Sequence, residues 1–190
     1  MAVALIAGLG NPGDRYTGTR HNAGFWFADA VVAAHGGQFQ YDSRSKGEVA
    51  RLRIDGHDLR VVKPQAFMNH SGQVVGALAR FYRIPVEAIL VAHDELDLGP
   101  GCVRLKSGGG HGGHNGLRDL ISHLGGRDFH RLRLGIGHPG SAKDVVDYVL
   151  TRPSVADRRS IDDAIDDTVR ELPGIVAGDF ANAMNRLHSR

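Results

Sequence analysis

A glycine-containing loop after the first apolar segment constrains this chain more than any other feature of its sequence. Residues 2–7 predict a buried strand, and the letters GLGNPG that follow have the GxGxxG spacing of dinucleotide-binding loops. In such loops a helix begins at once and directs its N-terminal N–H groups at a pyrophosphate. Here Pro12 and the glycines and threonines of residues 13–19 keep the chain irregular until about Asn22. The sequence therefore predicts a long polar loop that carries Asn11 and His21, which is typical of a reaction site.

Length and composition are those of an ordinary globular protein. The 190 residues suit one domain, and 42% hydrophobic and 23% charged residues exclude a disordered or fibrous chain. The one cysteine, Cys102, excludes an internal disulfide, and no apolar run approaches the roughly 20 residues of a membrane span. The apolar residues before Gly8 are too few for a signal peptide, so we expect a cytoplasmic protein.

Charge is unevenly distributed along the chain, although the net charge of +2 is too small to indicate a nucleic-acid partner by itself. Residues 103–143 contain seven Lys or Arg and two Asp, whereas residues 144–171 contain four Arg and eight Asp or Glu. One interpretation is an anionic partner for one face of the molecule, and the other is a set of solvated helix faces of mixed sign.

Period-two and helical patterns alternate along the chain and predict an α/β fold. A hairpin through Asp55-Gly56 makes part of the sheet antiparallel, whereas the apolar run 88–92 is typical of a central strand. We therefore expect a mixed, mostly parallel twisted sheet flanked by helices, with Asn22 as the N-cap of the first helix. The expected strands are 2–7, 48–54, 59–63, 88–92, 102–106 and 132–136, and the expected helices are 23–34, 71–82, 115–124 and two C-terminal helices that open at Ser154 and Pro173.

Four polar loops connect these elements, and ligands of open α/β sheets gather where strands end. Asp94 is expected just past a strand, where a carboxylate can hydrogen-bond an imidazole and fix its tautomer. We therefore expect the loops to converge on one site. Their candidate residues are Asn11, Tyr16 and His21 in the first loop, Phe67, Met68 and Asn69 in the second, His93 and Asp94 in the third, and the glycine-rich KSGGGHGGHNG in the fourth.

Five stretches of the sequence resemble bacterial peptidyl-tRNA hydrolases: GLGNPGDRYTGTRHNAGF, KPQAFMNHSG, HDELDLGPG, KSGGGHGGHNGL and RLRLGIGHPG. They follow the family's order and spacing over nearly the whole chain, so their combination is highly specific. The resemblance implies one α/β catalytic domain over residues 1–190 that cleaves the ester between a nascent peptide and the terminal ribose of tRNA, releasing free tRNA from prematurely dissociated peptidyl-tRNA. It further implies a monomer that needs no metal or organic cofactor.

The residue types in these stretches suit ester hydrolysis, because an alkoxide leaves more readily than an amine and one oriented base with a water can suffice. His21 is the expected general base, a neutral imidazole that Asp94 orients and stabilises once it is protonated. The resemblance implies that Asn69 helps to place the water and the substrate, that Asn115 holds the peptide main chain, and that Asn11 lies close to the scissile ester. A carboxamide fits these roles because it donates and accepts hydrogen bonds without adding charge.

Substrate contacts are expected on both sides of the ester. The resemblance implies that Phe67 and Met68 form a wall of the peptide cleft, and Tyr16 is a further candidate there. A helix from about Ala142 resembles the family's lid over the cleft. For the tRNA, backbone donors of the glycine-rich loop and positive side chains would meet phosphates, and the candidates are Gly112, Gly113, Lys106, Arg131, Arg133 and Lys143.

Two other interpretations stay open on the residues alone. A metal-dependent hydrolase would use His93, Asp94, His111 and His114 as ligands, but glycines between the loop histidines give poor preorganisation, and neither HExxH nor a cysteine pair is present. A non-catalytic tRNA- or nucleotide-binding module would use the glycine loops alone, which leaves the intact set of polar candidates unexplained. Without the resemblance, His21 is typical of a surface or capping residue, and even with it His111, His114 and His138 are typical of structural or substrate-contact roles.

Overall fold

A seven-stranded mixed sheet with the strand order β2-β3-β4-β1-β5-β7-β6 forms the centre of the protein in the computed structural model, which describes residues 1–189. The central strands β4, β1, β5 and β7 are parallel, and β2, β3 and β6 are antiparallel to their neighbours. The predicted α/β class with a parallel sheet centre is therefore confirmed. The strands are β1 (Leu5–Gly8), β2 (Gln40–Asp42), β3 (Gly47–Ile54), β4 (His57–Pro64), β5 (Ile89–Glu95), β6 (Val103–Ser107) and β7 (His130–Gly135).

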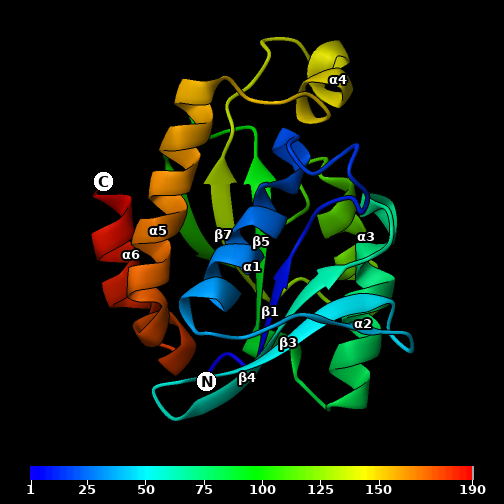
Figure 1. The fold of residues 1–190 in the computed structure, drawn as a ribbon, viewed down its shortest axis with the longest axis vertical. Helices are drawn as coiled ribbons and strands as arrows, with labels where there is room; N and C mark the ends of the chain where they lie inside the picture. The colour runs from blue at the N-terminus through cyan, green and yellow to red at the C-terminus, as the bar shows by residue number, and fades with distance from the viewer. Residues whose placement is uncertain (190) are drawn as a thin grey trace.

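Helices cover both faces of this sheet (Figure 1). The helices α1 (Ala23–Ala34), α5 (Val155–Ala177) and α6 (Phe180–His188) lie on one face, and α2 (Ser71–Phe81) and α3 (Asn115–Leu124) lie on the other. The strand β1 shows why two cores form: Ile6 packs with the residues of α1 and α5, whereas Leu5 and Ala7 pack with those of α2. The short helix α4 (Val145–Val149) lies beyond the carboxyl ends of β5 and β7.

Glycines of the first loop serve close packing of backbone. A Cβ on Gly8 would lie 2.2 Å from the carbonyl oxygen of Gly24, and a Cβ on Gly24 would lie 2.4 Å from the carbonyl oxygen of Ala92. These two glycines let α1 start directly against β1 and β5. The chain between β1 and α1 consists of turns and the 3₁₀ helix η1 (Arg20–Asn22), as predicted, and brings His21 to the end of the sheet.

Local signals located most elements correctly. Asp55 and Gly56 both have positive φ, 47° and 81°, and they join β3 to β4 as the predicted hairpin. The predicted bounds 23–34 and 115–124 are those of α1 and α3. The first strand begins later than predicted, at Leu5, and the short edge strand β2 was not predicted.

The C-terminal helices differ from the prediction. Pro173 does not open a helix, because α5 runs through it. A proline removes one helical hydrogen bond, but Leu172 and Ile175 are fully buried on either side, and their packing keeps the chain helical. The helix ends instead at Gly178, whose φ of 92° is left-handed and favours glycine.

Asn22 and Asp94 also differ from their predicted places. Asn22 precedes α1 but makes no side-chain capping bond to it. Asp94 lies within β5 and not past its end, so its side chain is held by regular strand backbone.

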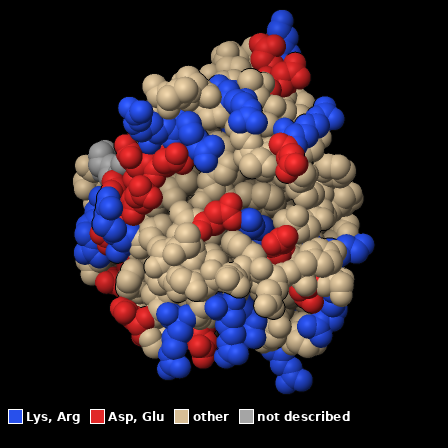
Figure 2. Space-filling model, in the orientation of Figure 1, with Lys and Arg blue, Asp and Glu red and all other residues tan. Residues whose placement is uncertain are grey.

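The charged helix surface accounts for the acidic stretch. Most of residues 144–171 lie on α5, and Figure 2 shows positive and negative side chains side by side along that edge of the molecule. Arg158 pairs with Asp162 at 3.0 Å, and Arg186 pairs with Glu171 at 2.5 Å. This stretch is therefore a solvated face of mixed sign. No helix among residues 1–189 is long and apolar enough to cross a membrane.

Candidate active site

A cavity of about 770 Å³ lies at the carboxyl ends of β1, β5 and β7, with α4 along one side. The loops after the strands converge there, as the sequence predicts for an open α/β sheet. Most of the predicted site residues line it: Asn11, His21, Phe67, Met68, Asn69, Asp94, Lys106, Gly112, Gly113, Asn115 and Arg133.

Two predicted site residues lie outside the lining. Tyr16 is half-buried at the margin, where its ring meets Phe67 edge-on with the centroids 6.1 Å apart. Lys143 is exposed in the 3₁₀ helix η4 (Ala142–Asp144), next to α4. Both are near the cavity without forming its wall.

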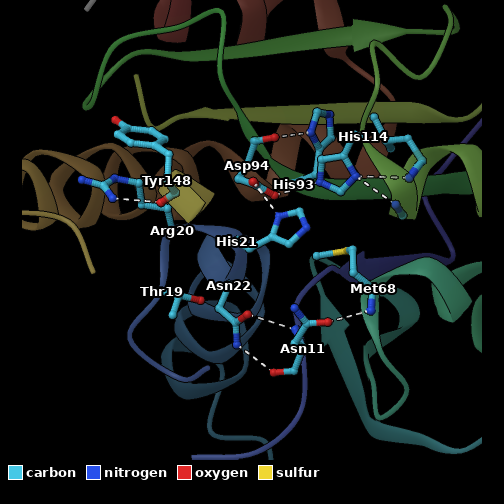
Figure 3. Close-up of polar contacts among 12 residues, drawn as sticks. Asn11, Thr19, Arg20, His21, Asn22, Met68, His93, Asp94, His114 and Tyr148 are labelled. Atoms are coloured by element: carbon cyan, nitrogen blue, oxygen red, sulfur yellow. Dashed lines mark hydrogen bonds and ion pairs between the residues drawn. The ribbon is translucent and has the colours of Figure 1, made fainter. Parts of the chain in front are cut away.

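Asp94 stands between two imidazoles at the centre of the cavity wall (Figure 3). Its Oδ2 accepts a hydrogen bond from Nδ1 of His21 at 2.8 Å, and its Oδ1 accepts one from Nε2 of His114 at 2.8 Å. Asp94 is only 4% exposed, so both bonds form away from bulk water. A buried carboxylate needs such partners, and each oxygen has one.

The hydrogen-bond partners fix the tautomers of these rings. Nδ1 of His114 accepts from the backbone N–H groups of Gly116 and Leu117, so the proton of its neutral ring is on Nε2 and is donated to Asp94. His21 likewise donates its Nδ1 proton to Asp94, since a carboxylate only accepts. The lone pair of His21 is therefore on Nε2, away from the carboxylate.

Electrostatics of the cluster follow from burial and from this pairing. Burial disfavours the Asp94 carboxylate, but His21 and His114 outweigh it and hold the pKa of Asp94 well below its usual range. Burial also lowers the pKa of His21, whereas the charge and the hydrogen bond of Asp94 raise it, and the net result is a pKa above 6.5. Burial lowers the pKa of His93 to about 4, so that ring stays neutral. The cluster thus holds an ionised carboxylate and an imidazole made more basic by it.

Asn22 holds Asn11 beside this cluster. The side chain of Asn22 accepts from the backbone N–H of Asn11 at 2.9 Å and donates to its carbonyl oxygen at 3.0 Å. The side-chain Oδ1 of Asn11 in turn accepts from the backbone N–H of Met68 at 2.7 Å. With its oxygen engaged, Asn11 presents its amide nitrogen on the side of His21 (Figure 3).

Two further carboxamides lie at the mouth of the cavity. Asn69 is exposed in the 3₁₀ helix η2 (Met68–His70), and Asn115 is exposed as the first residue of α3. Arg118 donates to Oδ1 of Asn115 at 2.9 Å, which orients that amide. Both residues line the cavity.

Basic side chains of β6 and β7 line the far part of the cavity. Lys106 and Arg131 are paired in the strand register, and Arg133 follows two residues on. Arg133 is bonded to Glu95 at 2.9 Å, whereas the buried guanidinium of Arg131 donates to the carbonyl oxygens of Gly109 and Gly110. Arg131 thus fixes the glycine-rich loop more than it offers charge to a ligand.

Comparison with known proteins identifies the family. The family model described as Peptidyl-tRNA hydrolase matches residues 5–190. This chain belongs to the peptidyl-tRNA hydrolase family. The peptidyl-tRNA hydrolase of Halorhodospira halophila is 58% identical over 185 residues, which cover 97% of this chain and 95% of that protein.

Solved structures agree with the family. The crystal structure of peptidyl-tRNA hydrolase from Acinetobacter baumannii is similar with a TM-score of 0.95 and 48% identity, covering 98% of this chain and 94% of that one. A purine nucleoside phosphorylase from Toxoplasma gondii is 10% identical with a TM-score of 0.57, and it shares the fold alone.

The residues that the metal-dependent interpretation requires as ligands do not form one cluster. Among residues 1–189, the group whose ligand atoms lie within 4.8 Å of one another is His21, Asp94 and His114, without His93 or His111. His93 donates Nδ1 to the Asp94 carbonyl, and His111 accepts from Gly113. A metal on Nε2 of His114 would move its proton to Nδ1, against two backbone N–H groups. The hydrogen bonds of the cluster therefore favour a proton on Nε2 of His114 over a metal ion there.

Sequence reasoning missed two residues of this peptidyl-tRNA hydrolase family site. The sequence alone favours a structural or substrate-contact role for His114 and a helix cap for Asn22. His114 does accept hydrogen bonds at the N-terminus of α3, and its place directly before that helix was a signal for this. Its bond to Asp94 and the bonds of Asn22 to Asn11 join segments distant in sequence, and no local pattern encodes them.

Proposed function

We propose that this chain hydrolyses the ester between a peptide, or an N-blocked aminoacyl group, and the terminal ribose of tRNA, with His21 as the general base. The observation that carries the proposal is that Asp94 accepts one hydrogen bond from His21 and one from His114. This arrangement leaves Nε2 of His21 as the free basic atom of the cluster. Nε2 takes a proton from a water as that water attacks the ester carbonyl. The Asp94 carboxylate stabilises the imidazolium that forms.

The proton then leaves with the ribose oxygen. The imidazolium of His21 returns a proton to the departing alkoxide, which yields free tRNA and a peptide carboxylic acid that ionises in water. Asn11, held by its backbone and by Met68, directs N–H groups toward the reacting carbonyl. Asn69 and Asn115 place the water and the peptide main chain, and the donors of these amides stabilise the developing oxyanion.

Substrate binding uses the two walls of the cavity. Phe67 and Met68, with Tyr16 at the margin, contact the peptide. Lys106 and Arg133 attract phosphates, and the backbone N–H groups at Gly112 and Gly113 add donors on the glycine-rich loop. Lys143, exposed beside the cavity, extends the positive charge toward the tRNA. Such contacts read phosphate and ribose, which suits an enzyme that serves many tRNAs.

Membership of the family supports a wider proposal. We propose that residues 1–190 act as one domain, as a monomer in the cytoplasm, on peptidyl-tRNA released early from translation, with no metal or organic cofactor in the reaction.

A direct assay tests the proposal. The purified protein is incubated with N-blocked aminoacyl-tRNA, with and without chelator, beside His21→Ala and the control His57→Ala at the hairpin end of the sheet. We expect release in both conditions, a loss in kcat of about 10²- to 10⁴-fold for His21→Ala, and no change for the control. Chelator-sensitive release would favour the metal-dependent interpretation, and binding without release would favour a binding module.

A further inference from the structure

Arg20, the residue before His21, binds the C-terminal end of the short helix α4. Its Nη1 donates to the carbonyl oxygens of Tyr148 at 2.9 Å and Thr151 at 3.3 Å, and the guanidinium carbon lies 3.8 Å from the centroid of the Tyr148 ring. The backbone N–H of Arg20 donates to Thr151 as well, at 3.1 Å. The Tyr148 carbonyl belongs to the last turn of α4, whose negative end favours a cation, and Thr151 lies two residues past the helix.

Tyr148 extends this contact to the end of β7. Its hydroxyl donates to the carbonyl oxygen of Ile136 at 2.6 Å, one residue beyond the strand. Gly137 leaves the room for it, since a Cβ there would lie 2.9 Å from the hydroxyl oxygen. One tyrosine thus joins η1, α4 and the sheet, and Figure 3 shows Arg20 and Tyr148 side by side to the left of His21.

The residues on both sides of His21 are therefore anchored, and by different parts of the fold. Asn22 is bound to the backbone of Asn11, and Arg20 is bound to α4. Between them η1 is a single turn, and its N-cap residue Thr19 makes no side-chain capping bond. The direction of the imidazole toward Asp94 thus depends on these two anchors.

Helix α4 also forms one wall of the cavity. Val145, Val146 and Val149 of α4 line it, as does Leu150 directly after the helix, and Val146 is 67% exposed. Arg20 therefore contacts α4, which forms a wall of the cavity, and belongs to η1, the turn that carries His21.

We propose that Arg20 is a positioning residue of the hydrolysis. Its contacts with Tyr148 keep the His21 imidazole in hydrogen-bonding position to Asp94 and link this position to that of α4. The inference rests on the proposed role of His21. Arg20 itself donates to α4 and not to the cavity. The titratable groups that face His21 are Asp94 of β5 and His114 before α3, whose ring centroid is 5.0 Å away.

The decisive variant is Arg20→Lys, which keeps the positive charge and loses the planar group that stacks and spans two carbonyls. The matched control is Arg60→Lys, because Arg60 stacks on Tyr82 at 3.6 Å, with both residues half-buried as Arg20 and Tyr148 are, outside the cavity lining. The readouts are kcat and KM with N-blocked aminoacyl-tRNA, and the NMR titration of the His21 imidazole without substrate.

We expect Arg20→Lys to lower kcat roughly 10- to 100-fold with a much smaller change in KM, as for a misaligned catalytic group. The His21 titration should move to lower pH, because a looser contact with Asp94 no longer raises the pKa. Arg60→Lys should change neither readout. Tyr148→Leu should reproduce both effects, and the double variant should lose little more than either single variant.

Wild-type kcat and an unmoved His21 titration in Arg20→Lys would overturn the inference, as would full additivity with Tyr148→Leu. Should Arg20→Lys fail to fold, Tyr148→Phe keeps the stacked ring and removes the bond to Ile136. It should shift both readouts in the same direction by a smaller amount, and no shift overturns the inference too. The titration needs no substrate, so failure of the proposed activity is distinguished from failure of this inference.

Discussion

Asn22 binds both polar groups of the Asn11 backbone, accepting its N–H at 2.9 Å and donating to its carbonyl oxygen at 3.0 Å. The two bonds resemble the pair of backbone hydrogen bonds that a neighbouring strand would make, at a loop position without a strand partner. Asn22 is 1% exposed and Asn11 is 7% exposed, so water cannot replace these bonds. The position of one proposed catalytic amide is thereby set by a side chain next to the proposed base.

Asn22→Leu keeps the branched shape of the side chain and removes both bonds. Each backbone group of Asn11 left unpaired in the interior costs about 1–3 kcal/mol of unfolding free energy. We expect a matching loss in urea-induced unfolding and a lower kcat, because Asn11 is no longer held. Asn22→Asp is the sharper comparison: it retains an acceptor for the N–H but sets a second acceptor against the carbonyl of Asn11. Unchanged stability and rate in both variants would contradict this account.

How far the sequence predicts this molecule depends on the range of each interaction. The turn at Asp55-Gly56 and the bounds of α1 were predictable because local backbone preferences decide them. Asn22 has the local signature of a helix cap, but its side chain bonds instead to the backbone of Asn11, eleven residues away in sequence. Pro173 has the local signature of a helix start, and burial of its neighbours overrides it.

The site shows the same division. Motifs located the loops that carry His21, Asp94 and the amides, and their convergence on one cavity follows from strand order. The second imidazole on Asp94 was not predictable, because His114 reaches it across the sheet end from the start of α3.

The pH dependence of the reaction should reflect the raised pKa of His21. A general base must be neutral, so the rate falls as pH drops through its pKa, and Asp94 moves that pKa above the ordinary histidine value of about 6.5. We expect the acidic limb of kcat/KM to lie above pH 6.5. A profile of kcat/KM with N-blocked aminoacyl-tRNA measures it, and a limb near pH 4 would point to His93 instead.

Arg133 should contribute to tRNA binding and not to the chemical step. Arg133→Ala removes one phosphate-attracting charge and leaves Glu95 without its 2.9 Å partner, so binding of full tRNA substrates should weaken. The slope of log affinity against log salt should decrease by about one. Hydrolysis of a minimal ester without the tRNA stem should be unaffected.

Glu95→Gln provides the opposite change, since it weakens the ion pair with the Arg133 guanidinium to a neutral hydrogen bond and removes a negative charge from the cavity. We expect tighter tRNA binding and a steeper salt slope from this variant. Equal losses on the tRNA substrate and the minimal ester in Arg133→Ala would place that side chain in the chemistry.

Asp94→Asn should act on the tautomer of His21 through the fixed tautomer of His114. Nδ1 of His114 accepts two backbone N–H groups, so its Nε2 keeps a proton and claims the single oxygen of the new amide. The NH₂ group then faces Nδ1 of His21 and forces the proton of that ring onto Nε2, the atom that must act as base. We expect kcat to fall by roughly 10⁴-fold, as for a base held in the wrong tautomer.

Releasing the amide tests this chain of hydrogen bonds. His114→Ser removes the imidazole and keeps a residue that can cap α3, so in the double variant the amide introduced by Asp94→Asn can turn its oxygen to His21. The double variant should therefore be more active than Asp94→Asn alone, and the loss that Asp94→Asn causes should be smaller in the His114→Ser background than in the wild-type background. Circular dichroism and thermal unfolding of all three variants control for folding. If the second substitution lowers kcat further, His114 does not dictate the orientation of the amide, and the tautomer account fails.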